Sequence, residues 1–520
     1  MVLSGLALVA QACGSGDQLP VAAAPDVLVT DDTTVTRTHE APYLLVDGDD
    51  PDTVYLSESE LQSGDCRFYV STNRGQTWAA EGSTVDSPVE TEKDPGAPPA
   101  PELANHSNCS LGTAGAQNIR TELDQAPDGT IYYTFHANDP NPEGSRSILL
   151  GRSNDGGRSW ETTVVDAGDE PGDQIEVNFQ AHTAIDPKNP QLIYTMWRRS
   201  YEARGDAERP PSRPYMAVSK DGGKTFGEPF EMLDLNPGFD GPRPVVVDGR
   251  LFAFYRQSAP PSSAGPAQDT KLFVATSTDQ GQSWAEPSLI ASAPDASEPV
   301  PLYDRDRKMF DVVFHDNRNG DLDVFYTSSK DGAKWTAPKR LNDDKPENDV
   351  GQYYPQISQS PDGRLDVAWY DYRNDPGPPP VPEEAGDPLT LSDNLGTLQS
   401  VYYSSSKDGG TTWTPNLKVT DVPIDRSIGT WNAQFFVVVP LSIASWDDRA
   451  LVTWSDTRNG TSATGSQDIF TGAVAPVGDE KDSTAVQAVA VVGAVLLGAG
   501  LALLAAVGFL RRSRKGSETA

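Results

Sequence analysis

The stretch Ser153-Asn154-Asp155-Gly156-Gly157-Arg158-Ser159-Trp160 holds the pattern that decides the fold. In it, an Asp accepts hydrogen bonds from backbone N–H groups, a Gly supplies a positive φ, a Ser or Thr hydroxyl caps the chain, and an aromatic ring packs beneath. These features suit a tight turn. The stretch therefore predicts a turn between two strands.

The same turn recurs along the chain, once in a form that is one residue shorter. Its Asp or Asn position is found at Asn73, Asp155, Asp221, Asp279, Asp331 and Asp408. Each copy follows two or three strand-like runs with alternating and aromatic-rich character, such as residues 364–370 and 400–404. Because chance does not account for six copies, the chain is expected to repeat a four-stranded antiparallel sheet.

Central strands of such sheets are expected in seven places, near Tyr55, Tyr133, Tyr194, Phe254, Phe314, Trp369 and Trp454. The seventh unit has no copy of the turn, as though its outermost strand were missing. Residues 25–30 could supply that strand and remove an exposed edge. We therefore predict an all-β propeller of four-stranded antiparallel blades, seven in number, with six as the alternative.

The formal charge of the 520-residue chain is −34, which argues against nucleic acid as a partner. An acidic exterior serves solubility, and calcium is the alternative explanation for acidic runs such as 47–52 and 316–323. His39, His136, His182 and His315 lack metal-ligand spacing. No metal site and no cofactor are therefore predicted, with calcium left open.

The N-terminal residues 1–25 are expected to be a signal peptide or lipobox region. A short apolar run ends before Cys13, as in an export signal, although a basic beginning is missing. The residues around Cys13 also resemble a bacterial lipoprotein lipobox, so Cys13 is a candidate for lipidation. In an exported protein, Cys66 and Cys109 are then a candidate disulfide.

The C-terminal part of the chain predicts membrane attachment. Residues 488–510 form a run of 23 residues without a charged side chain, long enough to cross a hydrocarbon core of ~30 Å. Arg511, Arg512, Arg514 and Lys515 follow it, so the positive-inside rule places the C-terminus in the cytoplasm. We expect an ectodomain over 26–475, a linker over 476–484, a transmembrane helix over 485–510 and a basic cytoplasmic tail over 511–520. This predicts a single-pass protein of the plasma membrane whose propeller is extracellular, at the cell surface.

The repeated turn resembles the Asp box, or BNR repeat, of sialidases and related propellers, and the resemblance covers roughly residues 26–475. In that family the Asp box joins the third and fourth strands of a blade, away from the central site. The six Asp-box positions are therefore expected to be structural. Ligands are expected on the opposite face, where the second strands of three blades end in Asp-x-Arg-Asn, at residues 316–319, 371–374 and 456–459.

The resemblance also implies which residues a sialidase-type site would use. Such a site needs arginines that bind a carboxylate bidentately, a Tyr nucleophile with a Glu partner, and an Asp acid/base. The arginine candidates are Arg243, Arg256, Arg318 and Arg373. The nucleophile candidates are Tyr354 and its neighbour Tyr353, with Glu298 or Glu176 as the partner.

Two departures from the family pattern weaken the catalytic interpretation. Where sialidases carry Arg-Ile-Pro, this chain has Glu40-Ala41-Pro42, and an acid there would repel a sialate. The threefold Asp-x-Arg-Asn also favours structural salt bridges over catalysis. We therefore expect a propeller that binds glycans or extracellular proteins without evident catalysis. The alternatives are a glycoside hydrolase of the exo-alpha-sialidase type and a purely structural surface protein.

Overall fold

The computed structural model describes residues 21–30, 33–35, 37–60, 65–80, 122–140, 143–168, 174–203, 210–233, 239–258, 269–375, 398–426, 428 and 441–476. The chain divides into a compact unit, Ala23–Val474, and a second unit made of Met1–Ala22 and Ala475–Ala520. Within the described ranges, no helix is long and apolar enough to cross a membrane. The expected membrane span at 485–510, the basic tail and Cys13 lie outside those ranges and stay predictions.

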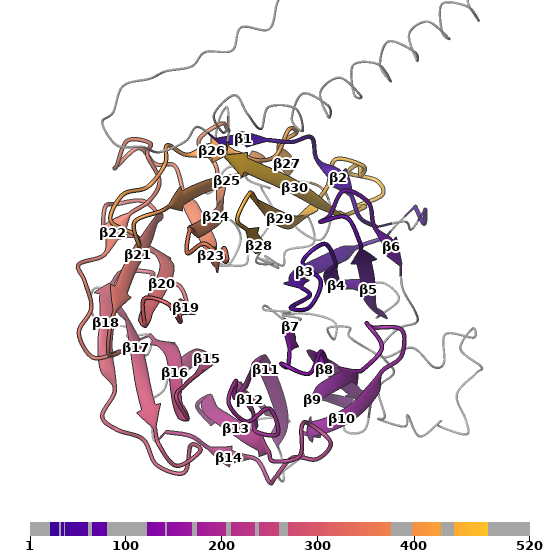
Figure 1. The fold of residues 1–520 in the computed structure, drawn as a ribbon, viewed down its shortest axis with the longest axis vertical. Coiled ribbons are helices and arrows are strands. Elements are labelled where there is room, and N and C mark those ends of the chain that lie inside the picture. Colours follow the sequence, from indigo (N-terminus) through magenta and orange to yellow (C-terminus); the bar gives the residue numbers. More distant parts are fainter. Residues whose placement is uncertain are drawn as a thin grey trace, which may run out of the picture. The chain divides into compact units, whose positions relative to one another are not determined.

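The unit Ala23–Val474 is a propeller of seven blades arranged around an axis, with the innermost strands facing the centre (Figure 1). This confirms the expected all-β class and the count of seven. Blade one contains β3 (His39–Val46), β4 (Val54–Glu60), β5 (Asp65–Ser71) and β6 (Ala79–Ala80). Blade two contains β7 (Glu122–Gln125), β8 (Ile131–Pro140), β9 (Glu143–Ser153) and β10 (Glu161–Asp166). Blade three contains β11 (Gln174–Ile185), β12 (Ile193–Ala203), β13 (Arg213–Ser219) and β14 (Phe230–Glu231).

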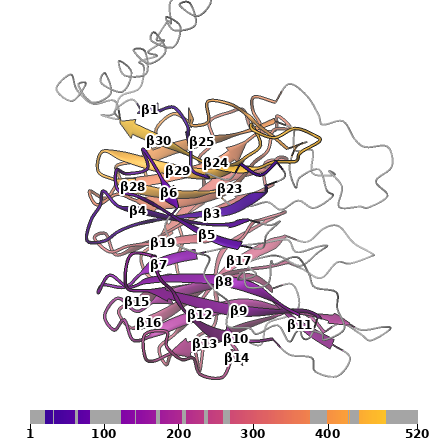
Figure 2. The ribbon, with the colours of Figure 1, turned by 90° about the vertical axis from the view of Figure 1, so that its right-hand side faces the viewer.

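The other four blades follow the same order from the axis outward (Figure 1), and Figure 2 shows the propeller from the side. Blade four contains β15 (Phe239–Val247), β16 (Arg250–Gln257), β17 (Thr270–Ser277) and β18 (Ser288–Ala293). Blade five contains β19 (Val300–Asp304), β20 (Met309–Asp316), β21 (Asp323–Ser329) and β22 (Lys339–Arg340). Blade six contains β23 (Gln352–Gln359), β24 (Leu365–Asp371), β25 (Leu398–Ser406) and β26 (Leu417–Lys418), and the short β27 (Ile424–Asp425) also pairs with β25.

Blade seven is completed from the beginning of the chain, as the sequence predicts. Its own strands are β28 (Ser442–Trp446), β29 (Arg449–Asp456) and β30 (Asp468–Pro476). The short β2 (Val27–Leu28), which follows β1 (Val21–Ala23), pairs antiparallel with β30. Arg37 also forms an ion pair with Asp468 of β30 (Nε to Oδ1, 2.5 Å). The N-terminal strand therefore covers the outer edge of β30.

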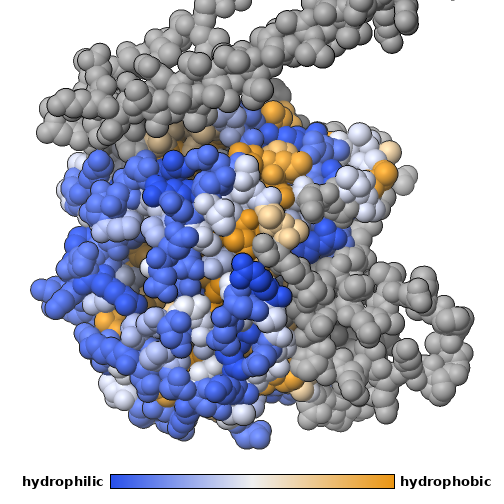
Figure 3. Space-filling model, turned by 45° about the vertical axis from the view of Figure 1, so that its right-hand side comes forward, coloured by the Kyte–Doolittle hydropathy of each residue, from blue (hydrophilic) through white to orange (hydrophobic). Residues whose placement is uncertain are grey.

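The hydrophobic core lies between successive blades. The central strands β20 and β24 are buried along almost their whole length, because each blade packs a neighbour on both of its faces. Phe252 and Phe254 of blade four, for example, pack against Phe310 of blade five, with ring centroids 4.7 and 5.5 Å apart. Hydrophilic residues cover most of the coloured exterior in Figure 3, as expected for so acidic a chain.

Each Asp box joins the third and fourth strands of its blade. In blade three, Thr225 donates to Asp221 from both its backbone N–H (2.9 Å) and its hydroxyl (2.6 Å). The hydroxyl of Ser219 donates to Asp221 (2.8 Å) and accepts from the N–H of Gly223 (2.8 Å). These hydrogen bonds, that of Thr225 first, lower the pKa of Asp221 to about 2. Asp155, Asp279, Asp331, Asp408 and Asn73 accept equivalent bonds in their own turns.

Candidate functional site

Four of the seven innermost strands contain the same irregularity. The pairing of β3, β11, β15 and β23 with the next strand shifts by one residue, near the start of β3, β15 and β23 and in the middle of β11. At each shift one residue has a positive φ: Ala41 (55°), Gln180 (53°), Gly241 (62°) and Tyr354 (53°). Innermost strands begin on the face opposite the Asp boxes, so the bulges of β3, β15 and β23 lie at the same end of the axis. The bulge of β11 lies beside them, because Gln180 accepts a hydrogen bond from the N–H of Gly241 (3.1 Å). A left-handed conformation costs a non-glycine residue roughly 1–2 kcal/mol, and three of the four residues are not glycine.

Tyr354 contacts His315, which comes from the end of β20 in the neighbouring blade. The backbone N–H of Tyr354 donates to His315 Nδ1 (3.0 Å), and the two ring centroids are 5.0 Å apart. Burial, together with the charge of Arg256, lowers the pKa of His315 to about 3. The imidazole is therefore neutral at pH 7. Because Nδ1 accepts a hydrogen bond, the ring proton lies on Nε2.

Glu298 connects two of the bulges. Gln180 donates from Nε2 to Glu298 Oε1 (2.5 Å) and accepts at Oε1 from the N–H of Gly241 (3.1 Å). A Cβ atom at Gly241 would lie 2.5 Å from Cδ of Glu298, so the close approach of the carboxyl requires a glycine there. Glu298 is 7% exposed and acts electrostatically on His315. Residues of blades three, four and five thus surround one carboxyl group.

The predicted arginines fall into two groups. Arg256 acts on His315 and donates to the carbonyl of Ala296 (3.5 Å), two residues before Glu298. Arg243 Nη1 lies 3.8 Å from Glu122 Oε1, and the same oxygen of Glu122 contacts His182. The structure therefore gathers Tyr354, Glu298 and Arg256 around His315, and it places Arg243 beside the bulge at Gly241.

Arg318 and Arg373 are held in ion pairs within the Asp-x-Arg-Asn repeats. Arg318 pairs with Asp316 (2.5 Å) and lies 4.3 Å from the ring centre of Phe325. Arg373 pairs with Asp371 (2.8 Å) and lies 4.4 Å from the ring centre of Tyr402. In blade seven, Arg458 does the same with Asp456 (2.7 Å) and Phe470 (4.2 Å). Such repeated geometry is what the structural interpretation of the motif expects. Among the described residues, neither Arg318 nor Arg373 contacts His315.

The remaining sequence candidates also have defined places. Tyr353 is buried, its hydroxyl lies 3.0 Å from that of Tyr372, and their rings stack at 5.5 Å. Glu176 forms an ion pair with Arg199 (2.9 Å). Cys66 of β5 is disulfide-bonded, but Cys109 lies outside the described residues, so their pairing stays a prediction.

Blade one places acids at this end of the axis. Glu40, at the start of β3, is buried and accepts from Nε2 of Gln467 (3.3 Å). His39 Nδ1 lies 3.0 Å from Glu58 Oε1. Although burial opposes it, the charge of Glu58 and its hydrogen bond raise the pKa of His39 above the usual value. The carboxylate expected at Glu40 therefore belongs to an acidic group.

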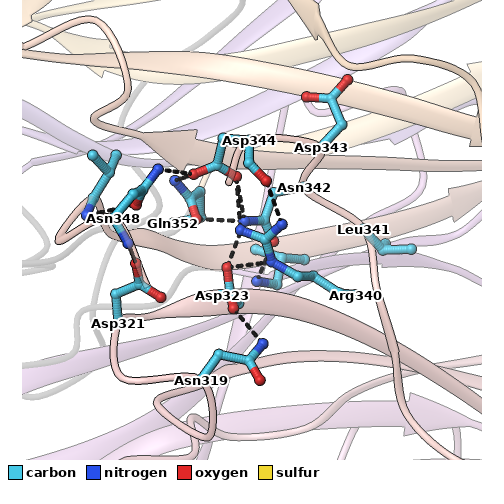
Figure 4. A network of polar contacts seen from close by, with 12 residues as sticks. Asn319, Asp321, Asp323, Arg340, Leu341, Asn342, Asp343, Asp344, Asn348 and Gln352 are labelled. Atoms are coloured by element: carbon cyan, nitrogen blue, oxygen red, sulfur yellow. Dashed lines mark hydrogen bonds and ion pairs between the residues drawn. The ribbon is translucent and has the colours of Figure 1, made fainter. Parts of the chain in front are cut away.

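The later part of the acidic run 316–323, with Asn319, Asp321 and Asp323, belongs to the polar network shown in Figure 4. The guanidinium of Arg340 lies between Asp323 (2.6 Å) and Asp344 (2.9 Å), and Asn342 donates to both carboxylates. An arginine thus supplies the positive charge that neutralises these acids. In the part of the chain that the structure describes, no group of three or more His, Cys, Asp or Glu side chains is arranged to hold a metal ion. The calcium alternative gains no support from this run.

Sequence reasoning missed Gln180 and gave His315 no role. Gln180 lies in an ordinary strand pattern, and no local signal marks its left-handed conformation. A weak signal marks the other three bulges, because Ala41, Gly241 and Tyr354 each precede a proline at the start of an innermost strand.

Residues 24–367 match a family model described as a BNR repeat-like domain. The match covers blades one to five and ends in the second strand of blade six. No curated protein matches the chain. Among solved structures, the chain is similar to a protein of unknown function from Dyadobacter fermentans, with 14% identity, a TM-score of 0.45, and 88% of this chain and 99% of that chain covered. It is also similar to a Hadza microbial sialidase, with 14% identity, a TM-score of 0.44, and 81% of this chain and 73% of that chain covered. An alpha-L-arabinanase of Penicillium chrysogenum is similar too, with 14% identity, a TM-score of 0.43, and 67% of this chain and 94% of that chain covered.

Proposed function

The chain belongs to the BNR repeat-like domain family, and on that premise we propose that it binds a glycan around Tyr354, at the end of the axis opposite the Asp boxes. The observation that carries this proposal is the set of four bulges at this end. Three non-glycine residues, Ala41, Gln180 and Tyr354, are held there in a costly conformation. Bulges re-aim side chains and are over-represented next to active sites.

The chemistry of the group around Tyr354 fits a ligand rich in hydroxyl groups. Arg256 supplies guanidinium donors, Glu298 supplies carboxylate acceptors, and the neutral His315 carries a donor at Nε2, since Nδ1 already accepts from Tyr354. Tyr354 is half-buried and adds an aromatic surface. The acids Glu40 and Glu58 in blade one disfavour an anionic sugar, so an uncharged glycan is the proposed ligand.

Glycan-array binding of the full-length protein, followed by calorimetry with the best glycan, tests this proposal. Arg256→Ala should weaken binding at least about tenfold, the usual effect of losing a charged hydrogen-bonding partner. Arg74→Ala is the matched control, because Arg74 lies in an Asp box and pairs with Asp52 on the other face (2.6 Å). Equal binding by wild type and Arg256→Ala would refute the proposed location.

A second candidate function is hydrolysis of a terminal sialic acid. It is favoured by the placement of Tyr354, Glu298 and Arg256 around one histidine, with Arg243 beside the next bulge. A fluorogenic sialoside tests it with wild type, Tyr354→Phe and Arg243→Ala. Turnover by wild type that both changes abolish would establish hydrolysis and replace binding as the function. Absence of turnover by wild type would exclude this candidate.

We also propose that the propeller is displayed at the cell surface, held by the apolar run 488–510. This rests on the length of the run and on the basic residues that follow it. Protease treatment of intact cells should release the propeller, whereas the C-terminal tail should stay protected. A protein that remains in the soluble fraction with residues 485–520 present would contradict this anchoring.

A further inference from the structure

A cavity of about 570 Å³ lies between the innermost strands of blades one to five. Its walls come from β3, β7, β11, β15 and β19, and its lining includes Gly48, Pro127, Pro187 and Arg305, in the turns that follow innermost strands. These turns share a face with the Asp boxes, as the hydrogen bond from Gly222 to Gln191 shows (3.0 Å). The volume is typical of sites for small molecules.

This cavity is distinct from the group around Tyr354. Innermost strands begin near the bulges and end at the cavity, so the two regions lie toward opposite ends of the axis. Glu122 lines the cavity and also contacts Arg243 and His182 near the bulges. None of Tyr354, Glu298 and His315 is among the residues that line it.

Among the residues that the structure describes, the carboxyl of Asp124 in this cavity forms no ion pair with a cationic side chain. Asp124 accepts a hydrogen bond from the backbone N–H of Gln125 (2.8 Å), and Arg305 acts on it only weakly. Burial, and to a smaller extent the charge of Glu122, raise the pKa of Asp124 to about 7, although hydrogen bonds from the backbone of Gln125 and Ile185 oppose this rise. A ligand that brings a positive charge would stabilise the ionised form of Asp124.

The rest of the lining combines apolar and aromatic side chains with polar surface. Tyr43, Leu123 and Tyr303 form part of the walls, and the hydroxyl of Thr134 is satisfied by Thr183 (2.7 Å). Aromatic and apolar walls next to a carboxyl suit an organic cation, because the rings attract positive charge and the walls bury the ligand's body.

We propose that this cavity binds a small organic cation, with an ammonium group against Asp124 and a compact apolar body against Leu123 and Tyr303. A simple metal ion or an anion would leave the apolar walls unused. This proposal is independent of glycan binding at the other end of the axis.

The test is calorimetry of the full-length protein with benzylamine at pH 8, where Asp124 is ionised, beside benzyl alcohol as the uncharged analogue. Benzylamine should bind, benzyl alcohol should bind at least about tenfold more weakly, and Asp124→Asn should remove the difference. Asp128→Asn, in the exposed turn that follows, is the matched control.

Two more variants keep the test decisive. Ala184→Phe fills the cavity without changing its charge and should abolish benzylamine binding, whereas Tyr354→Phe should leave that binding unchanged. Asp124→Asn should fold, because it removes a buried charge and keeps the shape of the side chain. Failure of wild type to bind benzylamine, or equal binding by wild type and Asp124→Asn, would overturn the proposal.

Discussion

Gly157 of the second blade packs directly against Phe68 of the first. A Cβ atom at Gly157 would lie 2.0 Å from Cε1 of Phe68, closer than two such atoms can approach. The same relationship joins Gly410 of blade six to Tyr326 of blade five, and Gly75 of blade one to Leu451 of blade seven. The glycine of the Asp box is therefore a contact between blades as well as a turn residue.

Gly157→Ala is expected to destabilise the propeller by about 2–5 kcal/mol, since it adds a clash of about 1–3 kcal/mol to the cost of a positive φ. Gly156→Ala is the control, because Gly156 also has a positive φ (74°) but its nearest neighbour would lie 3.7 Å from the new Cβ. Urea unfolding measures both variants. Equal losses would show that the contact with Phe68 has no energetic role.

Asp221→Ala should destabilise blade three at pH 7. The loss of stability should be smaller in acid. The folded protein holds the pKa of Asp221 at about 2, below the ordinary value of 3.8. The ionised carboxylate therefore stabilises the fold above pH 4, and this stabilisation is lost as the pH falls from about 4 to 2. Denaturant unfolding of wild type and variant at pH 7, 4 and 3 should show converging stabilities. A difference that does not change with pH would contradict this role.

Asp26 lies in the segment that covers blade seven. It should make the stability of the fold depend on pH in the direction opposite to that of Asp221. Burial, and then the nearby carboxyl of Asp421, raise the pKa of Asp26 to about 7, despite its ion pair with Arg458 (2.7 Å). Asp456, which also pairs with Arg458, is the other acid in this group. The protonated form of Asp26 thus stabilises the fold fully below about pH 4, and this contribution is lost as the pH rises through 7.

Asp26→Asn should therefore raise the melting temperature above pH 7, relative to wild type, and should make its pH dependence flatter. Thermal unfolding between pH 5 and 8.5 measures this change. Asp31→Asn, outside the described residues but close in sequence, controls for the loss of one acidic charge. A parallel shift of both variants at every pH would contradict a specific role of Asp26.

Gly241→Ala should weaken glycan binding more than it weakens the fold. The new methyl group would meet the carboxyl group of Glu298 at 2.5 Å and displace it from Gln180. Gly249→Ala is a matched control on the same pair of strands, with a positive φ (74°) and nothing within 4 Å. Calorimetry should show a loss of affinity of at least about tenfold for the first variant alone. Equal affinities would show that the position of Glu298 is irrelevant to binding.

The architecture could be predicted from the sequence because it depends on local chemistry that repeats. The turn around Asp155 specifies itself within eight residues, and its recurrence counts the blades. The missing strand of blade seven could also be inferred, because an uncovered edge beside β30 would be unfavourable.

The site was only partly predictable, because its contacts join distant parts of the chain. Gln180, Gly241 and Glu298 meet from three blades, and the left-handed conformation of Gln180 is imposed by that environment. Resemblance to a family suggested Tyr354 and Glu298. His315, which connects them electrostatically and by contact, has no spacing that marks it in the sequence.

The pairing of Val27 with Thr471 has a consequence for how the protein folds as it is synthesised. Its two strands leave the ribosome far apart in time, since β2 precedes blade one and β30 follows blades one to six. Until translation reaches β30, β2 has no partner, and the early blades can form only an open arc. Closure of the ring is therefore the final step of folding, and a chain whose synthesis stops before β30 cannot complete it.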